Sequence, residues 1–324
     1  MAALAARGYK PAMTAPTAGA PGRRLWDRPY LLLLVTTLLW AGNSVAGRLA
    51  VGHVSPMMLT ASRWMLVLGL LGAFMRRPIA EGLPILRANW KAAAWMGALG
   101  FTVFNALFYQ AAHETSAVNI SILQGAVPAL VMVGALVLHR TPVRLGQALG
   151  ILVALAGVAT IASQGRLSAL LALRFNRGDL FMAVACVLYA AYTLGLRGIA
   201  GVSSLAFFAG LAAAAFVTAL PLAGFEIAAG RAQWPDAAAW AILAYIALAP
   251  SLVSQVFFMR AVELIGPGRA GLFVNLVPVF GSLLAVLILH ETFGWHSAAA
   301  LALVLGGIAL AESSARGYAP LTTR

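Results

Sequence analysis

Two segments of the chain each place one aromatic and two further side chains on a single face of an expected helix. The faces are Trp40, Asn43 and Ser44 in TLLWAGNSVAGRLA (37–50) and Tyr189, Tyr192 and Thr193 in CVLYAAYTLGLRGI (186–199). Their common spacing of i, i+3 and i+4 brings the three side chains together. Aromatic rings attract cations, and amides and hydroxyls form hydrogen bonds, so such a face suits a small amphiphilic molecule. The alternative is hydrogen bonding between packed helices, which is common in membranes; the repetition of the pattern favours binding.

Similar side chains recur deep in other apolar stretches and complete the candidates for a substrate cavity. They are Phe104, Asn105, Tyr109, Asn119, Ser121, Gln124, Ser251, Ser254, Gln255 and Asn275. Four residues that loosen helices accompany them: Gly100, Pro128, Pro250 and Pro278. Each would either kink its helix permanently or act as a hinge, and the sequence leaves both interpretations open.

One basic residue, Arg63, lies well inside an apolar stretch. A charge buried in a membrane is costly, and it is usually functional or paired. Arg63 could bind a substrate carboxylate, tie helices together through carbonyls and amides, or extend toward the headgroups. We expect the structural role.

The residues that the sequence lacks limit how transport could be driven and whether the chain could be an enzyme. All nine acidic residues and all five histidines fall in tails, loops or near span ends. A proton relay through a carboxylate at the membrane midplane is therefore not expected, and facilitated diffusion or exchange is simpler; coupling through Asp179, Glu291 or a histidine stays open. There is no Walker loop, HExxH motif or Cys/His cluster at metal spacing, so we expect no metal, no cofactor and no enzymatic activity.

The composition indicates which elements must position these residues. Of the 324 residues, 62% are hydrophobic and only 10% are charged, against about 25% charged residues in soluble domains. The chain is therefore expected in a lipid bilayer, and its basic residues are too dispersed to indicate nucleic acid. A spanning helix needs about 20 apolar residues. The expected spans are 29–51, 56–75, 90–112, 115–138, 143–163, 179–197, 203–225, 237–260, 267–289 and 294–314.

The distribution of basic residues predicts the orientation of these spans. Sixteen of the 22 Lys and Arg residues fall on the side of the N-terminus, five on the opposite side and one within the second span. Because cytoplasmic loops carry the excess of basic residues, both termini are predicted to be cytoplasmic. Residues 1–28 are predicted to be a disordered cytoplasmic tail and residues 315–324 a second cytoplasmic tail.

The two halves of the chain are related in sequence at an offset of 149 or 150 residues. The aligned pairs include Trp40 with Tyr189, Asn105 with Gln255 and Pro128 with Pro278, and a one-residue slip then brings LHRT (138–141) onto LHET (289–292). Each copy holds five spans, the first within 29–163 and the second within 179–314, joined by the linker 164–178. An odd number of spans inverts the second copy. The predicted fold class is an all-α integral membrane protein, with ten transmembrane helices as two five-helix inverted repeats around a central cavity.

These segments resemble EamA-type members of the drug/metabolite transporter superfamily over about residues 29–314. The resemblance is carried by LLWAGNSVAGRLA, SPMMLTASRW, FYQAA, GDLFMAVACVLYAAYTLGLR and VPVFGSLLAVLILHETF. It implies a cavity lined by the first, third, fourth, sixth, eighth and ninth spans, with the fifth and tenth spans at the periphery. It also implies the inner membrane of a bacterium. One departure is that Arg140 stands where the family usually has an acidic residue, whereas Glu291 keeps the acid after the ninth span.

Within this family the chain is most similar to bacterial exporters of aromatic and other neutral amino acids. We therefore expect a secondary transporter that works by alternating access and exports small amphiphilic metabolites, as a monomer or weak homodimer. The alternative is a multidrug, quaternary-ammonium or other metabolite exporter of the same fold. A membrane enzyme lacks support because no paired carboxylates or nucleophile–base arrangement is present, and the inverted repeat favours a transporter over a channel.

Overall fold

The protein folds entirely into helices in the computed structural model, which describes residues 26–140, 144–166, 176–195 and 202–316. Ten helical segments of this described part are long and apolar enough to cross a membrane, so the prediction of an all-α membrane protein with ten spans is confirmed. Apolar runs form helices in lipid because a helix satisfies its backbone hydrogen bonds internally. The predicted tails fall almost entirely outside the described residues, although Trp26 and Asp27 already contact the eighth span.

The first repeat contains the first five spans and one additional helix. Its elements are α2 (Pro29–Leu49), α3 (Pro56–Phe74), α4 (Arg76–Ala88), α5 (Trp90–Gly97), η2 (Ala98–Val103), α6 (Phe104–Glu114), α7 (Ala117–Gln124), α8 (Val127–His139) and α9 (Leu145–Ala162). The third span is α5–η2–α6, and the fourth span is α7 and α8 joined by a short turn. The additional helix α4 is amphipathic and basic, which is typical of a helix at a membrane surface.

The second repeat has the same organisation, except that its described residues contain no counterpart of α4. Its elements are α11 (Arg177–Gly195), α12 (Ser204–Ala228), α13 (Ala237–Ile246), η3 (Ala247–Val253), α14 (Ser254–Ile265), α15 (Pro267–Phe273), η4 (Val274–Leu276), α16 (Val277–Leu289) and α17 (Trp295–Arg316). The eighth span is α13–η3–α14, and the ninth span is α15–η4–α16. The corresponding interruptions of the two repeats therefore occur in corresponding spans.

The four predicted kink residues lie at these interruptions. Gly100 belongs to the π-helix η2 and Pro250 to the π-helix η3, a rare helix type that is frequent at functional sites. Pro128 and Pro278 lie in the first turn of α8 and α16, where the missing N–H of proline costs no hydrogen bond. That any of them acts as a hinge stays a prediction.

The ends of α8 and α16 correct one detail of the sequence alignment. Both helices start at the 150-residue offset, and both end at a left-handed residue, Arg140 with φ 49° and His290 with φ 54°. The offset is therefore still 150 here, and the predicted one-residue slip that paired Arg140 with Glu291 does not occur. The counterpart of Glu291 is Thr141, which lies outside the described residues.

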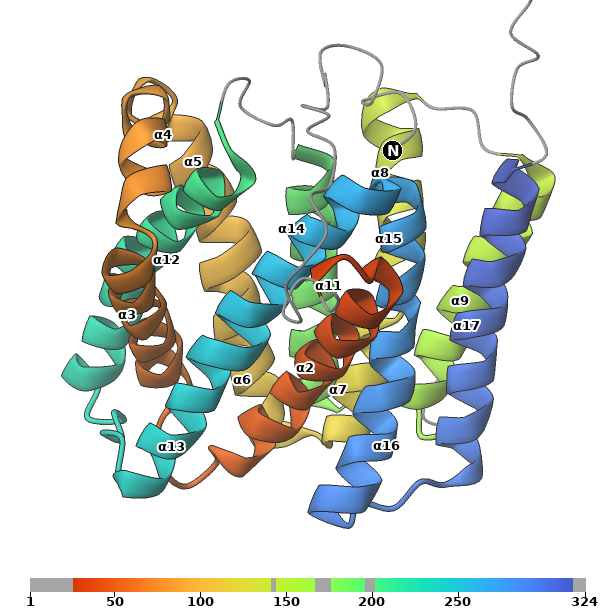
Figure 1. Cartoon of the computed structure of the whole chain (residues 1–324). Helices are drawn as coiled ribbons and strands as arrows, with labels where there is room; N and C mark the ends of the chain where they lie inside the picture. The colour runs from red at the N-terminus through yellow and green to blue at the C-terminus, as the bar shows by residue number, and fades with distance from the viewer. Residues whose placement is uncertain (1–25, 141–143, 167–175, 196–201, 317–324) are drawn as a thin grey trace, which may run out of the picture.

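The fifth and tenth spans, α9 and α17, pack along each other at one edge of the molecule (Figure 1). Their contact depends on glycine. A Cβ added to Gly150 would lie 2.5 Å from the Gly307 carbonyl oxygen, and one added to Gly307 would lie 2.5 Å from the Ala154 nitrogen. Small residues allow helices in membranes to approach this closely.

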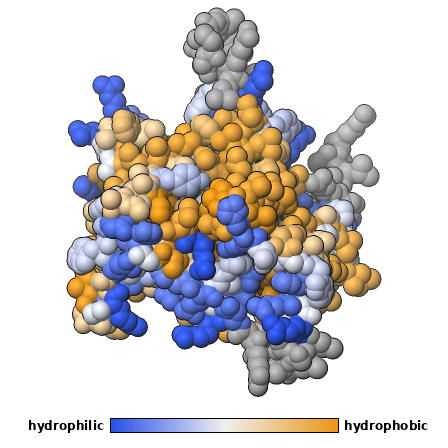
Figure 2. All heavy atoms as spheres, turned by 90° about the horizontal axis from the view of Figure 1, so that it is seen from below, coloured by the Kyte–Doolittle hydropathy of each residue, from blue (hydrophilic) through white to orange (hydrophobic). Residues whose placement is uncertain are grey.

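The two ends of the molecule differ in that both termini lie toward one of them (Figure 1). The termini side is the end where α17 ends, at the top of Figure 1, and the far side is the opposite end. Figure 2 shows the far side, where hydrophilic surface (blue) lies beside hydrophobic surface (orange). The most extensive helix pairs join the two repeats: α9 with α17, α6 with α11, α3 with α12, α7 with α16, and α2 with both α14 and α16.

Candidate functional site

Arg63 of α3 is the centre of a buried polar cluster, and its side chain is only 7% exposed. Its Nε donates to Ser251 Oγ at 3.0 Å. Its Nη1 donates to Tyr109 Oη at 2.6 Å and to Asn105 Oδ1 at 2.7 Å, with a longer contact of 3.4 Å to Asn43 Oδ1. Because the partners come from α2, α6 and η3, Arg63 joins four spans and both repeats. Such contacts are what the predicted tying of helices by Arg63 requires, and the role itself stays a prediction.

The charge of this cluster is not neutralised by any of its hydrogen-bond partners. All four partners of Arg63 are amides or hydroxyls, and Nη2 has no hydrogen-bond partner among the described residues. The neighbouring Trp64 also has a buried indole N–H without a partner in this part of the chain. Two donors, one of them cationic, thus remain available in a buried region, where an anionic group would be favoured.

A continuous run of aromatic rings begins directly beside Arg63. The rings, in order of contact, are Trp64, Phe101, Tyr192, Tyr189 and Phe104, with consecutive centroids 4.8 to 5.7 Å apart. The guanidinium carbon of Arg63 lies 5.1 Å from the centroid of Trp64. Such offset and tilted ring pairs are favourable packing arrangements. The run therefore brings a cation and an aromatic surface from both repeats into contact.

Glycine in the π-helix η2 makes room for one of these rings. A Cβ added to Gly100 would lie 2.4 Å from Cγ of Tyr192. The ring of Tyr192 therefore lies directly against the backbone of η2, and a side chain at this position would displace it.

Several other predicted cavity residues lie on the same spans with different partners. Trp40 packs on Phe258, with ring centroids 5.3 Å apart, and Gln124 Nε2 donates to Ser44 Oγ at 3.3 Å. The side chain of Gln255 has no hydrogen-bond partner within the described ranges. Within the described part of the chain, the Trp40 indole N–H and the Gln255 amide are therefore not engaged by another residue, as a binding surface requires.

Other predicted residues form hydrogen bonds within their helices or away from Arg63. The hydroxyls of Thr193 and Ser254 donate to carbonyls of their own spans. Asn119 lies on the far side, where its amide donates to Asp179. Asn275 donates to Glu312 of the peripheral α17, so the structure does not bring it to the aromatic run.

Sequence reasoning missed Trp64, Phe101 and Phe258 as members of these clusters. Trp64 and Phe101 directly follow the predicted residues Arg63 and Gly100, but a single aromatic residue in an apolar span is usually a packing residue. Their role becomes visible only when the crossing of α3, η2 and α11 is known.

Two glutamates on the far side accept hydrogen bonds from helices of the other repeat. Glu226 of α12 is buried, and its carboxylate accepts from Ser55 Oγ at 2.5 Å and from the Met58 N–H at 3.2 Å, at the start of α3. The Glu291 carboxylate accepts from the N–H groups of the first two residues of α7 at 2.9 and 3.0 Å. A carboxylate is stabilising at a helix N-terminus because it satisfies free N–H groups and faces the positive end of the helix dipole.

A third carboxylate, the buried Asp179 in the first turn of α11, holds the connection between α6 and α7. It accepts from Thr115 Oγ1 at 2.6 Å and from Asn119 Nδ2 at 3.1 Å. Sequence analysis placed Asp179 and Glu226 at span ends, which is correct, but it gave no indication that both are buried between the repeats. Their donors are 60 or more positions away in the chain, so no local pattern marks them.

An exposed pair joins the connections that flank α3 and α13 on the far side. Asp236 is the N-cap of α13, and its carboxylate also contacts His53 Nδ1 at 2.7 Å. The hydrogen bond with His53, followed by one from the Ala239 backbone, holds the pKa of Asp236 below its ordinary value of 3.8.

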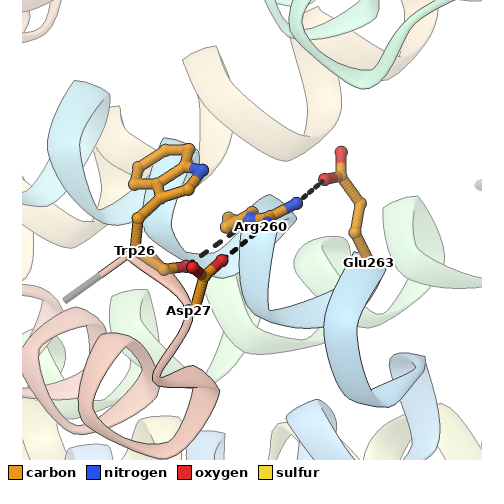
Figure 3. A network of polar contacts seen from close by, with 4 residues as sticks. All are labelled: Trp26, Asp27, Arg260 and Glu263. Atoms are coloured by element: carbon orange, nitrogen blue, oxygen red, sulfur yellow. Dashed lines mark hydrogen bonds and ion pairs between the residues drawn. The ribbon is translucent and has the colours of Figure 1, made fainter. Parts of the chain in front are cut away.

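On the termini side the repeats are joined by an exposed network around Arg260 of α14 (Figure 3). Arg260 Nη2 lies 3.0 Å from Asp27 Oδ1, and Nη1 lies 3.3 Å from Glu263 Oε2. Its Nε donates to the Trp26 carbonyl oxygen at 3.4 Å. Solvent-exposed ion pairs of this kind contribute little, typically about 0–1 kcal/mol.

Among the described residues, no group of three or more His, Cys, Asp or Glu could hold a metal ion. What the clusters offer instead is reversible binding through hydrogen bonds, charge and aromatic surface.

Comparison with known proteins gives the same pattern twice along the chain. The model of the EamA-like transporter family matches residues 27–163 and, separately, residues 176–312. The chain is 26% identical over 255 residues to the uncharacterized transporter YyaM of Bacillus subtilis, covering 77% of this chain and 82% of that protein. It is also 26% identical over 287 residues to an uncharacterized transporter of Archaeoglobus fulgidus, covering 88% of this chain and 97% of that protein.

A solved crystal structure has the same fold. It superposes with a TM-score of 0.62 at 22% sequence identity, over 90% of this chain and 99% of the solved chain.

Proposed function

Because the chain belongs to the EamA-like transporter family, we propose that it is a secondary transporter that exports neutral and aromatic amino acids by alternating access. The family places the chain among transporters and outside the enzymes. In the proposed mechanism the substrate binds between the two repeats and is released after they exchange conformations. The termini side is proposed to face the cytoplasm of a bacterial cell.

The observation that supports this substrate class is the contact between Arg63 and the aromatic run. An amino acid with an apolar or aromatic side chain carries a carboxylate, which suits a cation without a carboxylate partner. Its side chain suits the rings of Tyr189, Tyr192 and Phe104. The amides of Gln255 and Gln124 are proposed to bind the remaining polar groups, with Trp40 closing the surface from α2.

A multidrug or quaternary-ammonium exporter is the second candidate. The aromatic run itself favours it, since rings attract cations. The uncompensated charge of Arg63 opposes it, because a cationic drug would bind beside a buried cation. The two candidates therefore differ in the charge of the preferred substrate.

Counterflow of labelled amino acids in proteoliposomes tests the proposal. Saturable counterflow of Phe, Trp, Met or Thr, unaffected by an imposed pH gradient, is the expected result. Phenylalanine should compete well, whereas phenylalanine amide and a quaternary ammonium compound should compete poorly. Competition only by the cationic compounds would transfer the assignment to the second candidate.

Two variants connect the assay to the site. Trp40→Ala and Tyr189→Ala should each reduce counterflow about tenfold or more without loss of folded protein, because each removes ring surface from the proposed site. Trp234→Ala is the matched control, since Trp234 is 67% exposed outside the spans. Unchanged counterflow in both site variants would assign these rings to packing.

A further inference from the structure

The two ends of the molecule are not equivalent, although the repeats are. On the far side α7 packs closely on α16. The inverted repeat predicts a corresponding contact of α15 with α8 on the termini side, but these two helices make almost no contact. The halves of the fourth and ninth spans are thus together on the far side and apart on the termini side.

The closed side is also the side with the capping carboxylates. Glu291 follows α16 and caps the start of α7, so it fastens the same pair of helices that packs together. Asp179 holds the residues immediately before and within α7. Glu226 caps α3 from α12. Each of these contacts joins one repeat to the other.

The corresponding positions on the termini side carry no such carboxylates. The turn after α8, which corresponds to the turn with Glu291, has the sequence HRTPVR (139–144), with two arginines and no acid. At the repeat offset of 149 or 150 residues, the counterpart of Glu226 in the first repeat is Arg77 or Arg76, and both arginines are exposed. At the offset of 149 residues, the counterpart of Asp179 is Tyr30, which carries no carboxylate.

We infer that these three carboxylates hold the protein closed on the far side, and that its resting conformation is open toward the termini side. Closing the termini side by the repeat symmetry would bring no carboxylate to the corresponding helix starts. In place of Glu226 it would bring Arg76 or Arg77, a cation, toward the positive end of a helix, which is unfavourable. The two closures therefore differ in free energy. The exposed network of Arg260 does not offset this difference, since it joins α14 to the start of α2 and leaves α8 and α15 apart.

This inference rests on the alternating-access mechanism proposed above, and it gives that mechanism a direction. A resting state open to the termini side would be loaded with substrate from that side, which is the side an exporter must sample. Binding would then need to supply the free energy that separates the far-side contacts.

Distances between spin labels, measured without substrate, test the inference directly. Cys186 is the only cysteine, so Cys186→Ala provides a background for two introduced cysteine pairs. His113→Cys with Phe293→Cys reports the far side, and Leu138→Cys with Arg269→Cys reports the termini side. The unmodified background should give a predominantly short far-side distance and a long termini-side distance.

The capping variants should shift these populations. Glu226→Gln and Glu291→Gln should each raise the far-side-open fraction about two- to fivefold, the range expected for one charge at a helix terminus. Arg140→Glu should raise the fraction with a short termini-side distance, because it places a carboxylate beside Thr141, the counterpart of Glu291. Glu81→Gln is the matched control, because Glu81 is an exposed carboxylate on α4.

Two results would overturn the inference: a far side that is already open in the background protein, or distance distributions that are the same for Glu291→Gln, Arg140→Glu and Glu81→Gln. If the variant of the buried Glu226 fails to fold, Glu291→Gln and Arg140→Glu still test the inference, because these two positions are partly or fully exposed. Because no substrate is present, an absence of amino-acid flux would count against the proposed substrate and leave this result unaffected.

Discussion

At the scale of single residues, Arg63 is the side chain that would set the charge of the substrate in the proposed mechanism. Its planar guanidinium reaches partners on three other helical segments at once, a geometry that the compact ammonium of lysine cannot reproduce. Arg63→Lys keeps the positive charge and should lower amino-acid counterflow about tenfold or more, with only a modest fall in thermal stability. Arg87→Lys on the exposed face of α4 is the control. Counterflow at the parent level in Arg63→Lys would make Arg63 a helix anchor and nothing more.

Asp236 allows a residue-scale prediction about acid stability. Its pKa is lowered in the folded state, chiefly by the hydrogen bond with His53. Its stabilising contribution is therefore fully present above the ordinary value of 3.8 and is lost as the pH falls through the lowered value. Asp236→Asn should be less stable than the parent at neutral pH, and the two unfolding curves should converge in acid. A difference in stability that stays constant from about pH 6 to pH 3 would contradict this account.

At the scale of elements, adjacent glycines of α17 provide a matched pair. A Cβ added to Gly307 would meet the backbone of α9 at 2.5 Å, whereas one added to Gly306 would meet nothing within 4 Å. Gly307→Ala should destabilise the protein by about 1–3 kcal/mol through overpacking. Gly306→Ala should be neutral or stabilising by about 0.5–1 kcal/mol, because alanine is the better helix former. Thermal unfolding in one detergent measures both, and equal effects would mean that α9 and α17 do not pack this closely.

The elements also show which parts of the structure could be predicted from sequence. The spans were predictable because each crossing needs one long apolar run, and the interruptions at Gly100 and Pro250 because these residues weaken helices. The amphipathic α4 was not predicted, because it lies in the segment between the predicted second and third spans, which was interpreted as a loop. Asn43, Asn105 and Tyr109 were predicted individually, but their meeting at Arg63 depends on how α2, α3 and α6 cross. The capping carboxylates depend on contacts between repeats, which no local pattern encodes.

At the scale of the whole molecule, the two repeats depend on each other for their packing. The most extensive helix contacts, such as α9 with α17 and α6 with α11, all join one repeat to the other, and the buried charge of Arg63 has a partner in each repeat. Inside lipid, helices associate through close packing and hydrogen bonds between them. One repeat alone would lose most of its packing partners and would expose polar groups such as Arg63 and Glu226 to lipid, which is costly.

We therefore predict that neither repeat is stable alone and that the two assemble when produced as separate chains. A chain ending at Arg166 and one beginning at Asn176 should co-purify through a tag on either, with a thermal midpoint close to that of the intact protein. Gly150→Leu with Gly307→Leu should reduce co-purification, because these glycines allow the backbones of α9 and α17 to approach closely, whereas Gly306→Leu should leave it intact. A single half that is monodisperse and protease-resistant would show instead that each repeat is an independent folding unit. The inverted symmetry would then describe two modules in contact, and alternating access would have to arise from movement of one rigid half against the other.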